Sequence, residues 1–131
     1  MKIVIICGEF HKEEAESMIG YEFDEENMKK CEIVEIIRLP LAMEAPLALD
    51  RSLKDDSIDG AVVLGIIERG ETKHGQVIGQ AVTNSIIDLQ IKHDKPIGLG
   101  IIGPGAKAEH IDSRLESHAR SAVNAVYTMV E

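Results

Sequence analysis

Residues 69–75 place backbone amides, a hydroxyl and an imidazole at the point where an apolar run gives way to a helical pattern. They read Arg-Gly-Glu-Thr-Lys-His-Gly and follow the run from Gly60 to Ile67. The backbone amides of Glu71, Thr72 and Lys73 are expected at the first turn of the helix, where free N–H groups and the helix dipole suit a phosphate. The segment therefore predicts an anion site, although a simple N-cap at Thr72 would produce the same pattern.

Side chains elsewhere could add further chemistry to this anion site. A neutral imidazole at His74 can act as a general base. Phe10 is one of only two phenylalanines in the chain, and it could stack on a flat heterocycle or pack beneath a helix. Glu44 could bond a polyol or be a solvated acid at a helix start. Arg114 could bind an anion or form a surface salt bridge.

Four apolar runs rich in Ile and Val are the strands that must position these side chains. The first, third and fourth are nearly continuous, which is typical of strands covered on both faces. Segments with helical spacing alternate with the runs, so the order predicts a mostly parallel α/β sheet with helices on both faces. The runs are Ile3–Cys7, Ile33–Leu39, Ala61–Ile67 and Pro96–Ile102.

The helical patterns differ in strength. The first, over residues 12–30, is interrupted by Gly20, Asp24 and Asn27, so a bent or two-piece helix is expected there. The second, over residues 45–54, is short and has Pro46 near its start, where proline is well tolerated. The third and fourth carry apolar stripes. These stripes are Ile78, Ala81, Val82, Ser85, Ile86 and Leu89, then Ile111, Leu115, Ala119, Ala122, Val123, Val126 and Val130.

The chemically unusual residues all follow predicted strands. In a parallel sheet the carboxyl ends of the strands share one edge, and ligands bind in the crevice beside that edge. The segments that should meet there are residues 8–11, 40–44, 69–75 and 103–105. Any one of them could be ordinary turn chemistry. Their convergence predicts a ligand site at this edge.

Length and composition restrict the function further. The 131 residues suit one domain, residues 1–131. The formal net charge of -9, from 14 basic and 23 acidic residues, makes nucleic acid a poor partner. The spacing of the five histidines matches no closed set of metal ligands. Cys7 and Cys31 are expected to be reduced thiols, and the chain lacks a long apolar span, so we expect a cytoplasmic protein with no membrane association.

Residues 67–74, Ile-Glu-Arg-Gly-Glu-Thr-Lys-His, resemble the (V/I)-x-R-G-x-T-x-H signature of the 6,7-dimethyl-8-ribityllumazine synthase family. The resemblance extends over nearly the whole chain, and its last part is most similar to the archaeal branch. The supporting segments are residues 9–10, 40–48, 94–96 and 99–105.

This resemblance implies a flavodoxin-like, three-layer sandwich with a four-stranded parallel sheet. It implies a homopentamer, or a multiple of pentamers, with active sites between neighbouring subunits. The implied reaction condenses 5-amino-6-(D-ribitylamino)uracil with 3,4-dihydroxy-2-butanone 4-phosphate, without a metal or redox cofactor.

The family also implies roles for individual residues. Proton transfer falls to His74. Phe10 stacks on the pyrimidine, Glu44 holds the ribityl chain, and Leu99 lies on the neighbouring subunit's side of the pocket. The implied substrate-binding set is Phe10, His11, Met43, Glu44, Glu71, Thr72, Leu99 and Arg114, with Thr72, its neighbouring backbone and Arg114 on the phosphate.

Three residues depart from the family pattern. His11 replaces an asparagine, Leu41 a glycine, and Met43 a bulky aromatic residue. A lysine common in the last helix has no clear counterpart, although His118 and Arg120 lie nearby. These changes affect the ribityl side of the pocket and leave the residues implied in proton transfer and phosphate binding intact.

Alternative functions remain open at this point. The altered ribityl-side residues would also suit a non-catalytic pentamer that binds a flavin precursor or serves as a shell subunit. The intact Arg-Gly-Glu-Thr-x-His segment argues against the related archaeal riboflavin synthase. A response-regulator-like switch is disfavoured because the third run ends without a phosphorylatable aspartate.

Overall fold

The computed structural model describes residues 1–8, 12–22, 31–40, 42–68, 72–106 and 111–130. Within these ranges four strands form one sheet in the order β2-β1-β3-β4, and every adjacent pair is parallel. This is the strand order of flavodoxin-like folds, in which the ligand crevice opens between β1 and β3. The strands are β1 (Lys2–Gly8), β2 (Glu32–Leu39), β3 (Gly60–Glu68) and β4 (Ile97–Ala106).

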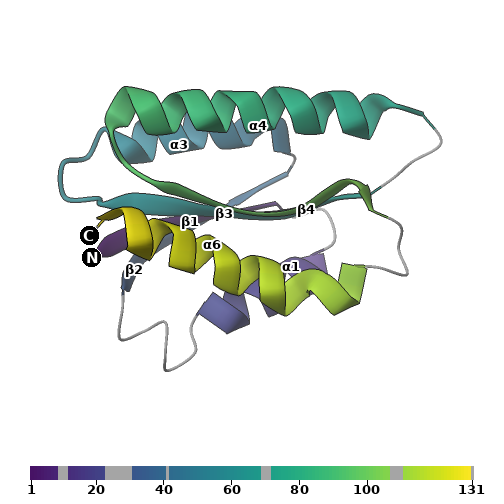
Figure 1. Ribbon diagram of the computed structural model, residues 1–131, viewed down its shortest axis with the longest axis horizontal. Helices are drawn as coiled ribbons and strands as arrows, with labels where there is room; N and C mark the ends of the chain where they lie inside the picture. Colours follow the sequence, from purple (N-terminus) through teal and green to yellow (C-terminus); the bar gives the residue numbers. More distant parts are fainter. Residues whose placement is uncertain (9–11, 23–30, 41, 69–71, 107–110, 131) are drawn as a thin grey trace.

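Helices cover both faces of the sheet (Figure 1). In the view of Figure 1, α3 and α4 lie above the sheet and α1 and α6 lie below it, which confirms the predicted α/β three-layer sandwich. The helices are α1 (Lys12–Glu22), α3 (Ala45–Leu53), α4 (His74–His93) and α6 (Leu115–Val130), with short 3₁₀ turns η1 (Ala42–Glu44) and η2 (Asp112–Arg114).

Strand alternation divides the core into two halves. Ile3, Ile5 and Leu64 pack toward α1 and α6, because their side chains point to one face of the sheet. Ile6 and Val63 point to the other face, toward α3 and α4. All five are buried, which explains why the first and third apolar runs are nearly continuous. Strand β2 lies at the edge of the sheet and has several exposed residues.

The predicted helices are largely confirmed. The stripe of α6 is buried from Leu115 to Val126, whereas Val130 is exposed. In α4, Val82 and Ile86 are buried as expected, but Ala81 is exposed. The described part of the first helix ends at Glu22, and residues 23–30 lie outside the described ranges. None of the described helices is long and apolar enough to span a membrane.

Two glycines of β4 have conformations or contacts that require the absence of a side chain. The sequence places residues 103–105 in a loop, yet β4 continues to Ala106. Gly103 has a φ of 103°, a left-handed conformation that favours glycine, so the strand can bend there without ending. Gly98 allows a close approach between layers, because a Cβ at this position would lie 2.1 Å from the carbonyl oxygen of Ala122 in α6.

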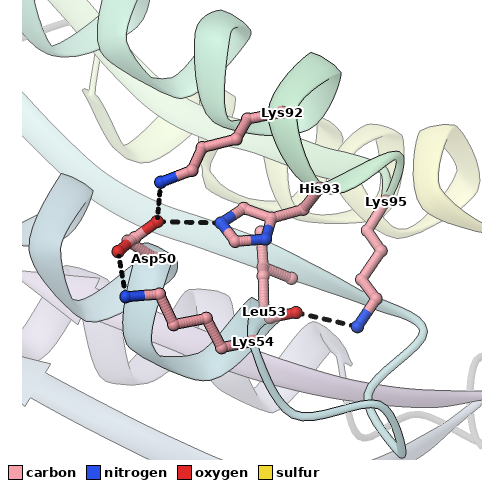
Figure 2. Close-up of polar contacts among 6 residues, drawn as sticks. All are labelled: Asp50, Leu53, Lys54, Lys92, His93 and Lys95. Atoms are coloured by element: carbon pink, nitrogen blue, oxygen red, sulfur yellow. Dashed lines mark hydrogen bonds and ion pairs between the residues drawn. The ribbon is translucent and has the colours of Figure 1, made fainter.

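A cluster of polar contacts joins the carboxyl ends of α3 and α4 (Figure 2). The carboxylate of Asp50 contacts Lys54 and Lys92, each at 3.0 Å, and His93 at 2.8 Å. Lys95 donates from Nζ to the carbonyl oxygen of Leu53 at 2.8 Å. Hydrogen bonds from Lys54, His93 and Lys92 hold the pKa of Asp50 well below its usual range.

Candidate active site

An apolar cavity of about 320 Å³ lies at the carboxyl ends of β1 and β3, beside the start of α4. Its position is the crevice that the strand order predicts. Its lining comes from the strands, from η1 and from α4 with the segment before it. These residues are Ile6, Gly8, Leu39, Ala42, Met43, Ala45, Val63, Leu64, Gly65, Ile66, Ile67, Thr72, His74, Gly75, Ile78, Val82 and Ile101.

Thr72 and His74 lie at this cavity and are both exposed. The hydroxyl of Thr72 accepts a hydrogen bond from the backbone N–H of His74, with 3.3 Å between the two atoms. A hydroxyl that accepts a hydrogen bond still has its own proton to donate. Thr72 can therefore fix the local turn and bond a ligand oxygen at the same time.

Helix α4 begins later than the sequence suggested. Its N-cap is Lys73, whose side chain makes no capping hydrogen bond, and its first helical residue is His74. The N–H of Val77 donates to the carbonyl oxygen of Lys73 at 3.0 Å, so the amides of Gly75 and Gln76 precede the intrahelical ladder. By helix geometry, the first-turn amides of α4 that have no intrahelical partner therefore include those of Gly75 and Gln76.

The residues of η1 divide between two hollows. Met43 lines the cavity and is 64% exposed. Glu44 is the N-cap of α3 and lines a second groove of about 770 Å³ beside β2 and α3, which shares Leu39 with the cavity. The structure therefore places Glu44 in the lining of this groove and not in the described lining of the cavity.

Leu99 and Arg114 are absent from the described lining of the cavity. Leu99 is 39% exposed on β4. Arg114 ends η2 and precedes α6, which packs on the opposite face of the sheet from α3 and α4. The described lining of this chain's own cavity thus includes neither Leu99, which the resemblance places on the neighbouring subunit's side of the pocket, nor Arg114, which it places on the phosphate.

Some predicted site residues lie outside the described part of the chain. Phe10, His11 and Glu71 belong to this group, as does Leu41. The structure adds Gly65, which sequence analysis did not select, and it places Gly8, the first residue of the predicted segment 8–11, in the lining of the cavity. The only sequence signal for Gly65 is a glycine within an otherwise apolar strand, which can mark close approach of a ligand or a backbone.

Comparisons with known proteins agree with this geometry. A sequence model of the family described as 6,7-dimethyl-8-ribityllumazine synthase matches residues 1–131. A protein of that name from Staphylothermus marinus is 35% identical over 129 residues, which are 98% of this chain and 86% of that protein. The Metallosphaera sedula protein is 34% identical over 98% of this chain and 85% of its own length. The Saccharolobus solfataricus protein is 32% identical over 100% of this chain and 85% of its own length.

The fold, the cavity at the β1–β3 crevice and the match over the full length of the sequence agree with one another. The chain belongs to the 6,7-dimethyl-8-ribityllumazine synthase family.

Proposed function

We propose that this protein condenses 5-amino-6-(D-ribitylamino)uracil with 3,4-dihydroxy-2-butanone 4-phosphate to form 6,7-dimethyl-8-ribityllumazine in riboflavin biosynthesis. Family membership over residues 1–131 is the observation that carries the proposal. The geometry supports it, because Thr72, His74 and Gly75, at and just before the start of α4, line an apolar cavity. One end of the site suits an anion and the other suits a flat ring.

The reaction needs positioning and proton transfers. The primary amine attacks the ketone and loses water to form an imine, phosphate leaves, and closure of the second ring releases another water. The steps balance without an oxidant or a reductant, so no redox cofactor is required. Holding both substrates together can supply about 7–11 kcal/mol of barrier lowering. Proton transfer by a positioned side chain typically contributes about 10²–10⁴-fold.

His74 is the residue best placed to move these protons. It is the first residue of α4, it lines the cavity, and its backbone N–H bonds the Thr72 hydroxyl. In our proposal the hydroxyl of Thr72 and the amides of Gly75 and Gln76 bind the phosphate at the positive end of the helix dipole. His74 then accepts and returns protons at the amine and at the leaving group.

The site is completed by a second copy of this chain. Arg114 and Leu99 would serve the pocket of a neighbouring subunit, which accounts for their absence from the described lining of this chain's own cavity. We propose a homo-oligomer, a pentamer or a multiple of pentamers, with each phosphate site supplied by two subunits.

The outer face of α4 supports such an assembly. Val77 and Ile91 are exposed large apolar residues separated by two heptads, and Asn84 lies midway between them. Ile87 is exposed on the adjacent row, three residues after Asn84. This is the spacing with which helices pack against one another in coiled coils. A surface of this kind suits contact with the same helix of other subunits around a symmetry axis.

The decisive experiment incubates the purified protein with both substrates and follows lumazine absorbance together with released phosphate. We expect both products in equal amounts. Absence of product despite tight binding of the pyrimidine would instead favour a non-catalytic binder.

The solution mass, measured by light scattering, tests the assembly, since a monomer would contradict the shared site. We further propose that the enzyme acts in the cytoplasm on these small molecules without a metal cofactor.

A further inference from the structure

Two glycines lie side by side on the two central strands of the sheet. Cys7 of β1 pairs with Leu64 of β3, so the next residues along these parallel strands, Gly8 and Gly65, are adjacent. Both line the cavity. They also lie on the two strands between which the strand order opens the crevice.

These glycines face the cavity. Gly8 follows Ile6 by two residues and Gly65 follows Val63 by two, so both share the face that packs toward α3 and α4. A Cβ built on either glycine would meet no atom within 4 Å. The space that a side chain would fill at both positions is therefore open.

Other glycines of the sheet behave differently. A Cβ at Gly98 would lie 2.1 Å from Ala122, and one at Gly100 would lie 2.6 Å from Leu64. Those two glycines make room for other parts of the protein. Gly8 and Gly65 leave room that no described atom of this chain uses.

We call the part of the cavity around this pair the slot. Leu39 is the partner of Gly8 on β2, and Ile101 is the partner of Gly65 on β4; both line the cavity. A single row across the sheet thus has an apolar side chain at each end and bare backbone in the middle. Ile78 and Val82 of α4 form the apolar wall opposite the sheet.

We propose that Gly8 and Gly65 form a floor of bare backbone on which the flat pyrimidine ring of the aminouracil substrate rests. The proposal rests on the proposed function and specifies which part of the cavity selects the ring. A planar ring can lie against exposed peptide groups only where no Cβ stands between them. The anionic butanone phosphate does not suit this apolar slot, because a buried charge without partners is strongly unfavourable.

Substitution of the two glycines with side chains of increasing size tests whether the pyrimidine ring rests on them. Gly65→Ala and Gly65→Val place a small and a larger side chain in the slot, and Gly8→Ala does so from the neighbouring strand. We expect the KM for the pyrimidine to rise about 10-fold or more for alanine, and further for valine, because a filled slot excludes the ring. The KM for the butanone phosphate should stay unchanged. Thermal unfolding should also stay close to wild type for the alanine variants, since the added methyl group meets open space.

Gly20→Ala is the matched control. Gly20 is an exposed glycine of α1 with no atom within 4 Å of a built Cβ, and α1 covers the opposite face of the sheet. This variant should keep both KM values.

The outcomes distinguish the proposed role of the two glycines from the proposed reaction. If the wild type forms lumazine and the Gly65 variants keep its KM for the pyrimidine, the proposed role of the glycines is wrong while the proposed function stands. If the wild type forms no lumazine, the proposed function fails, and fluorescence titration with 6,7-dimethyl-8-ribityllumazine then tests the floor. Weaker binding by Gly65→Val than by wild type would support it. Equal binding, or no binding to the wild type, would overturn it.

Discussion

The Nε2 atom of His93 lies 2.8 Å from Oδ1 of Asp50 and connects the end of α4 to α3 (Figure 2). Both side chains are largely buried, with 10% of His93 and 19% of Asp50 exposed. Helices α3 and α4 cover the face of the sheet that contains the cavity. The contact therefore fixes these two helices at the end of the sheet that lies away from the cavity mouth.

Asp50→Asn should destabilise the protein at neutral pH. The pKa of Asp50 is held below its ordinary value of 3.8 by Lys54, His93 and Lys92. A group whose pKa is lowered by folding contributes stability above its unfolded-state pKa, and this contribution is lost as the pH falls toward the folded-state pKa. The gap in unfolding free energy between wild type and variant should be full above about pH 4 and decline progressively below it.

Urea unfolding at a series of pH values measures this gap. Asp56, an exposed aspartate shortly after α3, provides the control, and Asp56→Asn should show no comparable gap. A constant difference between wild type and Asp50→Asn from neutral to strongly acidic pH would contradict the role of the charged carboxylate.

Gly98→Ala should be destabilising for a steric reason. The new Cβ would lie 2.1 Å from the carbonyl oxygen of Ala122, so α6 would have to move away from β4. Overpacking of this kind typically costs about 1–3 kcal/mol. Chemical denaturation measures the loss, and Gly65→Ala is the comparison in the same sheet that should leave stability unchanged. Equal stability of the two variants would mean that α6 tolerates the shift.

The sequence predicted the strands well because strands buried on both faces must be apolar along their whole length. Ile3 to Cys7 and Ala61 to Ile67 show this directly. The composition of a strand does not fix its register, however, and only the register places Gly8 beside Gly65. The start of α4 was also beyond prediction, since Thr72 bonds the His74 amide without being the helix N-cap.

The site was predictable only where chain order alone determines position. Thr72 and His74 follow β3 directly, so they had to lie at its carboxyl end. Arg114 lies more than a whole strand further along the chain, and its relation to the cavity depends on which face α6 covers. Local sequence patterns do not contain that information.

Thr72→Val should weaken phosphate binding while Thr72→Ser should preserve it. Valine keeps the shape of the side chain but removes the hydroxyl that bonds the His74 amide and is proposed to donate to the phosphate. Loss of a hydrogen bond to a charged group costs about 1.5–3 kcal/mol, or roughly 10- to 150-fold in the KM for the butanone phosphate. Steady-state kinetics with each substrate varied separately distinguishes this from a general loss of activity. Similar KM values for the valine and serine variants would argue against a role for the hydroxyl.

Mixing two impaired variants should raise activity above that of either variant if the site is shared between subunits. His74→Ala should slow turnover while substrate binding survives, and Arg114→Ala should weaken the phosphate substrate more than the pyrimidine. In a ring assembled at random from equal amounts of both variants, a site with both residues intact forms at roughly a quarter of the interfaces. Activity of co-refolded mixtures, measured by lumazine absorbance, should therefore rise toward roughly one quarter of the wild-type value, far above either variant alone.

A mixture of His74→Ala with a chain that has both substitutions is the control and should stay inactive, because no intact His74 is present. If the first mixture stays as inactive as this control although both variants assemble, His74 and Arg114 do not act together across an interface.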